Sequence, residues 1–367
     1  MLMCMVTASD VVTSETTLSL TQLREEFATD GGYLSACTLG LPLTCTRRAL
    51  TADLERSTAG HPDVAGYAAA VESSRYSFAR LVRISPEQVA IGSQTSVLAA
   101  LIASGVPDGG EVLVAEQDFS SLLLPFTHVG RGIRVRQVPL GMLADEVNET
   151  TSLVAFSLVQ SCSGEVADAD AVIEAAQRFG ARTFCDATQA VGWLAVDAGR
   201  YDALVCHAYK WLCSPRGVAF LALSDRFCAE LTPQFAGWYS GEDPWSSCYG
   251  IEITPARSAR RFDVSPAWQA FLGAAPALDA FASADADAIF QYTTDLAARF
   301  RIGMGIPEPI RASAMVSWSD ETGQDLRRLA TGGMTASGRA GRSRVAFHVF
   351  NDAEDVDRAV SALRSRS

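Results

Sequence analysis

One lysine stands among hydrogen-bonding and aromatic side chains, in a stretch where a free surface charge is unexpected. Lys210 lies between two apolar runs, residues 201–206 and 217–223, which the pattern predicts to be short buried strands. Its neighbours include His207 and Tyr209 rather than solvating charges. A partly desolvated lysine loses its proton more readily and can form a Schiff base with a carbonyl compound. The alternative is an ordinary surface lysine at a strand end.

A carboxylate and an amide stand upstream of this lysine. Asp186 ends an apolar run that begins near Arg182, and Gln189 follows three residues later. A carboxylate at a strand end is often a helix cap or a surface charge. Beside a lysine, however, it can keep a pyridinium nitrogen protonated, which is the pairing that pyridoxal phosphate sites use.

A third feature is typical of an anion site. Residues 86–91 are predicted to form a strand that runs into Gly92, a hydroxyl-rich turn and an apolar helix over 97–103. The unpaired N–H groups and the dipole at such a helix start attract phosphate, with Ser93, Gln94 and Thr95 as the candidate donors. The alternative is a plain helix cap without a ligand.

These motifs occur in an order that resembles a known family. The segments Asp186-Ala187-Thr188-Gln189, His207-Ala208-Tyr209-Lys210 and Ser214-Pro215-Arg216-Gly217 are similar to the signature of the class V aminotransferase and cysteine desulfurase family. The members are fold type I pyridoxal phosphate enzymes, and the resemblance extends from about Tyr33 to the C-terminal helix. It implies that Lys210 carries the cofactor, and that Asp186 holds its ring nitrogen protonated.

The resemblance also implies roles for residues along the chain. The cofactor-binding set that it implies is Ser93, Gln94, Thr95, Phe119, Gln160, Asp186, Gln189, His207, Tyr209 and Lys210. The Phe119 ring is expected against the cofactor ring, although an aromatic residue at a helix start is by default a core residue. Gln189 would donate to the ring hydroxyl, and His207 and Tyr209 would help to hold phosphate. Gln160 departs from the family pattern, which has Asn near this position.

The substrate implied by the family is an amino acid. Arg344, followed by His348 and the pair Phe350-Asn351, matches the family pattern, and a guanidinium can grip an α-carboxylate through two parallel hydrogen bonds. Ser161 and Thr38 are the other candidate substrate-binding residues. A strand-edge arginine without a ligand is the alternative for Arg344.

The alternation of strands and helices predicts an α/β fold. We expect a large domain over residues 31–265 with a mostly parallel seven-stranded sheet covered by helices, the seven strands being what fold type I implies. We expect a smaller α+β domain over 266–367, and an N-terminal arm and helix over 1–30 that packs with it. The family resemblance adds a homodimer with active sites at the subunit interface.

The sequence indicates the cofactor more clearly than it indicates the type of reaction. Transamination is the first expectation, and a carbon–sulfur or β-eliminating lyase, including a cysteine desulfurase-like enzyme, is the alternative. Desulfurisation needs a thiol on the loop ahead of Arg344, and residues 331–341 contain no cysteine, which leaves Cys37 and Cys162 as the candidate thiols near the pocket. A non-catalytic binding protein would have no need of Lys210 and Asp186. A nicotinamide oxidoreductase is not supported, because the sequence lacks the glycine-rich fingerprint GxGxxG at a first strand-to-helix turn.

The amino-acid composition argues against several classes of binding partner. The 367 residues carry a net charge of -12, which argues against nucleic acid or an anionic membrane surface as the main partner. Nine cysteines occur without CxxC pairs or Cys/His clusters, which indicates free thiols in a cytoplasmic protein and no metal site. The apolar stretch at residues 1–6 is too short for a signal peptide or membrane span.

Overall fold

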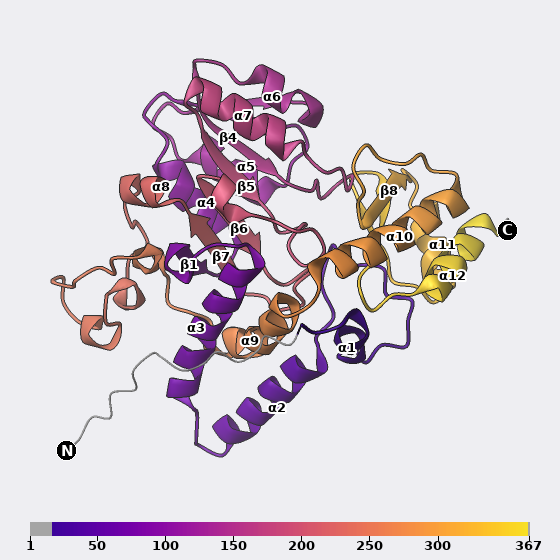
Figure 1. Ribbon diagram of the computed structural model, residues 1–367, viewed down its shortest axis with the longest axis horizontal. Helices are drawn as coiled ribbons and strands as arrows, with labels where there is room; N and C mark the ends of the chain where they lie inside the picture. The colour runs from indigo at the N-terminus through magenta and orange to yellow at the C-terminus, as the bar shows by residue number, and fades with distance from the viewer. Residues whose placement is uncertain (1–16, 366–367) are drawn as a thin grey trace.

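A seven-stranded sheet forms the centre of the molecule (Figure 1). The structure, a computed structural model, describes residues 17–365. The strands are β1 (Val89–Gly92), β2 (Glu111–Ala115), β3 (Arg134–Val138), β4 (Thr151–Ser157), β5 (Arg182–Asp186), β6 (Ala203–His207) and β7 (Ala219–Leu223). Their spatial order is β1-β7-β6-β5-β4-β2-β3; β7 runs antiparallel to both of its neighbours, and the other pairs are parallel. The predicted mostly parallel α/β sheet is therefore confirmed.

Helices cover both faces of this sheet because its strands are apolar on both sides. In β2, Leu113 and Ala115 point into one core while Val112 and Val114 point into the other. The first core is closed by α3 (Val64–Leu81), α7 (Ala169–Phe179) and α9 (Trp268–Ala282). The second is closed by α4 (Thr95–Ser104), α5 (Ser120–His128) and α8 (Asp225–Glu230). The two remaining helices of this part are α2 (Thr44–Thr58) and the short α6 (Leu143–Glu146).

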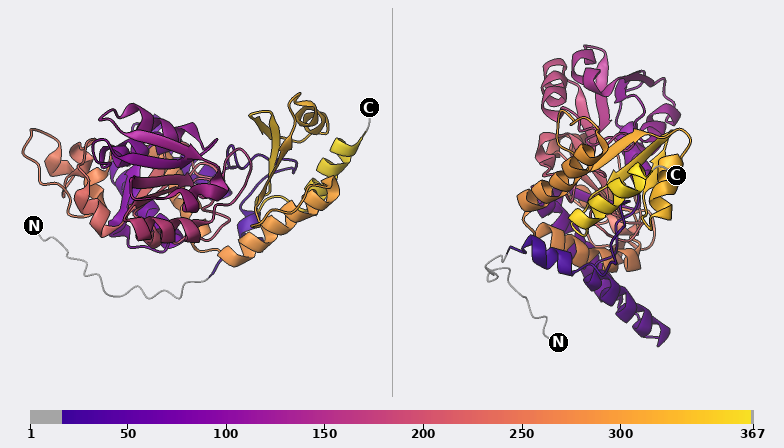
Figure 2. Two further views of the ribbon diagram at one scale, coloured as in Figure 1. Left: turned by 90° about the horizontal axis from the view of Figure 1, so that it is seen from above. Right: turned by 90° about the vertical axis from the view of Figure 1, so that its right-hand side faces the viewer.

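A second, smaller sheet lies in a separate lobe. Its strands β8 (Met315–Ser319), β9 (Ser337–Arg339) and β10 (Arg342–Ala346) are antiparallel in the order β8-β10-β9. They pack with α10 (Ala286–Met304), α11 (Gln324–Thr331) and α12 (Ala353–Arg364) around a core of its own. Figure 2 shows α10 running from the large lobe to the small one, with α1 (Leu20–Glu25) near its start.

Helix α9 affects where a domain boundary is drawn. The sequence divides the chain at residue 266, yet α9 packs against α2 and α3, and its Phe271 and Leu278 belong to the core of the large lobe. Leu296 and Phe300 of α10, in contrast, belong to the small-lobe core. We propose that the small domain begins within α10 and that α9 is part of the large one.

Local signals explain several element ends. Gly180 ends α7 in a left-handed conformation (φ 72°), and the Asp352 side chain caps α12. The strand predicted over 86–91 is wrong in its first half, because residues 86–88 form a 3-10 turn capped by Ser85. Proline has no N–H for a ladder hydrogen bond, so the strand starts only at Val89.

Candidate active site

Three neighbouring parallel strands end at one edge of the large sheet and deliver polar side chains there. Ser157 ends β4, Asp186 ends β5 and His207 ends β6. Ser157 is paired directly with Asp186 in the ladder. The carboxyl ends of parallel strands are where α/β folds place ligands, and a cavity of about 290 Å³ opens at this edge.

Lys210 enters this cavity from the turn that follows β6. The turn is fixed by main-chain hydrogen bonds from Ala208 to Val218 (3.0 Å) and from Cys213 to the Lys210 carbonyl (3.1 Å). The lysine is 5% exposed, and its Nζ lies 5.3 Å from the centroid of the Phe119 ring. Burial lowers the pKa of Lys210 from 10.5 to about 8, although the nearby Asp186 carboxylate opposes this shift.

Asp186 lines the same cavity and is also buried. One of its oxygens accepts a hydrogen bond from the Thr188 N–H (2.8 Å). Burial raises the pKa of Asp186 to about 6, while the hydrogen bonds from Thr188 and the charge of Lys210 act in the opposite direction. The amine and the carboxylate that the sequence singled out thus lie in one enclosed space.

The start of α4 forms another wall of the cavity. Gln94, Thr95 and Ser96 line it, whereas Ser93 is exposed and is not among the lining residues. His207 lines the same cavity, and its Nε2 atom is buried without a hydrogen-bond partner within residues 17–365. Burial, followed by the charges of Arg216 and Lys210, lowers the pKa of His207 to about 3, so its ring is neutral. A neutral imidazole nitrogen and helix N–H groups are suitable donors to an anion.

Arg344 reaches the cavity from strand β10 of the small lobe and is 1% exposed. Its guanidinium donates to the Ser161 carbonyl and to the hydroxyls of Ser161 (3.2 Å), Ser337 (3.1 Å) and Thr38 (3.4 Å). Its Nε has no partner among the described residues. The three side chains that the sequence assigned to the substrate, Arg344, Ser161 and Thr38, therefore lie together.

The two glutamines differ in position. Gln189 lines the cavity, but its amide donates to the Cys37 carbonyl (2.9 Å) and accepts from the Trp211 indole (2.8 Å). Its role toward a ring hydroxyl stays a prediction. Gln160 does not line the cavity, because its amide donates to the Asp118 carboxylate (3.0 Å). The Ser157 N–H donates to the same carboxylate (2.7 Å).

Sequence reasoning gave no role to three residues of this site. Asp118, which precedes Phe119, accepts four hydrogen bonds and so fixes the segment that carries this ring. Arg216 lines the cavity with its guanidinium 4.5 Å from the Tyr209 ring centroid, and Arg339 lines it from β9. Asp118 follows an apolar strand and was recognisable as a strand-end carboxylate. Nothing in the local pattern distinguishes Arg339 from a solvated arginine.

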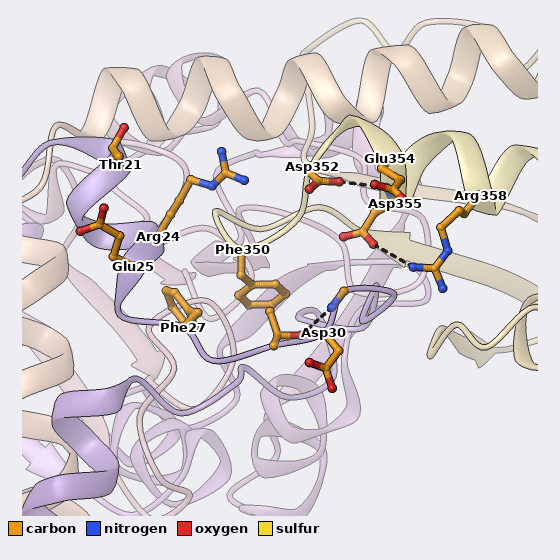
Figure 3. Close-up of a pocket in the computed structure, with 12 residues that line it drawn as sticks. Thr21, Arg24, Glu25, Phe27, Asp30, Phe350, Asp352, Glu354, Asp355 and Arg358 are labelled. Carbon is orange, nitrogen blue, oxygen red and sulfur yellow. Dashed lines mark hydrogen bonds and ion pairs between the residues drawn. The ribbon is translucent and has the colours of Figure 1, made fainter.

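A larger cavity, of about 540 Å³, lies between α1 and the start of α12 (Figure 3). Glu25, Asp30, Glu354 and Asp355 make its lining mainly acidic, and Figure 3 shows Phe350 between them. The described residues that line it include no lysine, so it offers no amine to a carbonyl compound. The Lys210 cavity is therefore the candidate active site.

Comparison with known proteins agrees with this geometry. The family model for class-V aminotransferases matches residues 55–312, which is most of the chain. The protein belongs to this family, whose members use pyridoxal phosphate. None of the helices within residues 17–365 has the length and apolar character needed to cross a membrane.

Individual relatives carry different activities. An uncharacterized aminotransferase of Bacillus subtilis, YcbU, is 25% identical, and the alignment covers 81% of this chain and 84% of that protein. A probable cysteine desulfurase of Aeropyrum pernix is 32% identical over 46% of this chain and 45% of its own. Among solved structures, the cystine C–S lyase C-DES, in complex with cysteine persulfide, has a TM-score of 0.81 at 19% identity, covering 91% and 97% of the two chains. This last likeness concerns the fold alone.

Proposed function

We propose that the protein is a pyridoxal phosphate enzyme that acts at the Cα of an amino acid and that its reaction is transamination. The observation that carries the proposal is the meeting of Lys210, Asp186 and Arg344 in one cavity of about 290 Å³. An amine, a carboxylate and a buried guanidinium from three separate elements have no evident structural reason to converge there.

The residues present fit the cofactor. The buried His207 Nε2 lacks a partner within residues 17–365, so a phosphate oxygen would satisfy it together with the N–H groups at the start of α4. Asp186 would hold the proton on the ring nitrogen, and the Phe119 side chain would lie against the ring. Tyr209, beside His207 with ring centroids 4.3 Å apart, would complete the phosphate end.

The protein side chains have distinct tasks in such a reaction. Bound pyridoxal phosphate supplies a ring that accepts negative charge from Cα. Arg344 orients the substrate by its α-carboxylate. Lys210, with its pKa lowered to about 8, is partly neutral near pH 7.5 and can take the proton from Cα and return it.

The test of this proposal is covalent trapping at Lys210. Purified protein supplied with pyridoxal phosphate is treated with borohydride, digested and analysed by mass spectrometry. We expect the cofactor mass on the peptide that contains Lys210, and neither trapping nor activity in Lys210→Ala. Normal absorbance and activity in Lys210→Ala would refute the assignment.

The choice of transamination rests on two observations. The aminotransferase relative aligns with most of both chains, and no cysteine occurs in residues 331–341, ahead of Arg344. The second candidate, a carbon–sulfur or β-eliminating lyase, is favoured by Cys37, which lines the cavity with its Sγ 3.6 Å from the Ser337 hydroxyl. Cys162 is not among the lining residues. Measuring 2-oxoacid with and without an amino acceptor, and released sulfide, separates the two reactions.

We also propose a homodimer with active sites at the subunit interface. The segment between α8 and α9 projects from the large lobe (Figure 1), and it exposes Trp245 (58%), Tyr249 (93%) and Ile251 (97%). Exposed apolar side chains gathered on one segment mark an interaction surface. Arg260 and Arg261 follow this segment and would face the partner's phosphate site in the arrangement that the family resemblance implies.

A further inference from the structure

The active-site cavity has one more cationic side chain than the proposed function assigns a partner. Its lining has four cationic side chains, Lys210, Arg216, Arg339 and Arg344, and one carboxylate, Asp186. This inference rests on the proposed function, in which Asp186 pairs with the ring nitrogen and Arg344 with the substrate α-carboxylate. Arg216 lies against Tyr209 and influences His207, so it belongs to the phosphate end. Arg339 is the cation that remains.

Sheet geometry places Arg339 on the same face as the substrate-binding arginine. Strand β9 pairs with β10 so that Ser337 faces Arg344 and Arg339 faces Arg342. The Ser337 hydroxyl accepts from Arg344 (3.1 Å), and side chains two residues apart on a strand share a face. The β-carbons of Arg344 and Arg339 are therefore diagonal neighbours, roughly 7–8 Å apart. Two guanidiniums at this spacing suit a molecule with two carboxylates.

The Arg339 guanidinium is also available. Within residues 17–365 its hydrogen bond goes to the carbonyl of the adjacent Gly338 (2.7 Å), and it forms no ion pair. Its neighbour Arg342 provides a contrast, because that guanidinium donates to the Ser317 hydroxyl (2.9 Å) and carbonyl (3.1 Å) on β8. Of Arg339 and Arg342, only Arg339 lines the cavity.

We propose that Arg339 binds a carboxylate on the substrate side chain and that the enzyme selects small dicarboxylic amino acids. The small cavity volume agrees with a small substrate, since the cofactor and the substrate share about 290 Å³. Aspartate and glutamate are the expected class, and their amides are the disfavoured counterparts.

Binding of unreactive dicarboxylates tests this proposal independently of the reaction type. Succinate and glutarate lack an amine, and their monoamides, succinamate and glutaramate, differ only in one charge. Each compound is titrated calorimetrically into three holoenzymes: the wild type, Arg339→Gln and Arg342→Gln. We expect wild-type enzyme to bind the dicarboxylates about 10-fold more tightly than the monoamides, because a charge-assisted hydrogen bond is lost. Arg339→Gln should abolish the preference and leave monoamide affinity unchanged.

Arg342→Gln is the matched control, because it removes the same charge from the same hairpin, and it should keep the preference. Equal affinity for succinate and succinamate in the wild type overturns the proposal. So does an equal loss for both ligands in Arg339→Gln, which would mean that Arg339 assists at the α-carboxylate. Failure to trap the cofactor at Lys210 sinks the proposed function instead. Equal affinity for succinate and succinamate in a wild-type enzyme that is trapped normally sinks only this inference.

Discussion

Lys210 and Asp186 each shift the pKa of the other against the effect of burial. Burial alone would drive the lysine further toward its neutral form, and the Asp186 carboxylate partly restores the charge, leaving the lysine pKa at about 8. Burial raises the pKa of Asp186, and the lysine charge counteracts it. The cavity therefore holds an amine that is partly neutral, and an aspartate that is mostly ionised, at physiological pH.

This coupling gives a pH prediction. The neutral amine reacts with an aldehyde, so the rate at which the cofactor-free protein recombines with pyridoxal phosphate should rise with pH through a midpoint near 8, not near the ordinary 10.5. Asp186→Asn removes the charge that raises the lysine pKa, so its midpoint should lie at lower pH. Stopped-flow absorbance across pH 6–10 measures both.

The control is Asp108→Asn, an exposed carboxylate before β2, at the opposite edge of the sheet. Its midpoint should match the wild type. A midpoint that moves upward in Asp186→Asn would contradict the predicted coupling between these two side chains.

At the scale of elements, the loop that carries Lys210 packs tightly against the segment that carries Thr38. The Gly40 N–H donates to the Tyr209 carbonyl (2.9 Å), and a β-carbon at Gly40 would lie 2.0 Å from the Lys210 carbonyl oxygen. Both neighbours are main-chain atoms, which cannot turn aside as a side chain can. Only glycine allows this approach, which brings Thr38 and Cys37 to the cavity.

Gly40→Ala should therefore destabilise the protein and disturb cofactor attachment together. Overpacking of this kind costs about 1–3 kcal/mol, which urea unfolding measures. Borohydride trapping at Lys210 should fall in the same variant, because the loop must move. Gly141→Ala is the control: its β-carbon would meet nothing within 4 Å, so its stability should stay within about 0.5 kcal/mol of the wild type. Equal stability of the two variants would show that the contact is not rigid.

At the scale of the whole molecule, the site depends on two lobes meeting. Arg344 comes from the small lobe, and its hydrogen bonds to Ser161 and Thr38 reach the large one. Ser317 on β8 makes a second link, donating to the Cys162 carbonyl (2.9 Å). These polar contacts hold Arg344, the proposed substrate-binding residue, in the cavity that Lys210 lines, so we expect a movement between the lobes to change substrate affinity before it changes the cofactor site.

The proposed homodimer gives a prediction at the same scale. The wild type should sediment as a dimer, and the double variant Tyr249→Asp with Ile251→Asp should weaken association by at least about 10-fold, because charges would be buried at the interface. Ile310→Asp is the control, since Ile310 is 96% exposed but lies near the small lobe. A monomeric wild type, or a dimer weakened only by Ile310→Asp, would rule out this surface.

The sequence by itself indicated most of the elements and the candidate reacting groups. Apolar periodicity marked the strands that lead to Asp186 and His207, and Lys210 was recognisable because its neighbours are unlike those of a solvated surface lysine. These signals are local, since they depend on residues a few positions apart. They also placed Thr95 in a turn ahead of a helix, whereas α4 begins at Thr95 and the lining of the cavity runs from Gln94 to Ser96 rather than from Ser93.

Only the tertiary structure decided which distant side chains face the cavity. Gln160 leaves a strand end exactly as Ser161 does, but its amide turns to Asp118, more than 40 positions away, while Ser161 meets Arg344. Arg339 and Arg342 look alike in the sequence, yet one lines the cavity and the other binds Ser317. Such choices depend on which main-chain and side-chain groups become neighbours when two lobes pack, and a one-dimensional pattern does not contain that information.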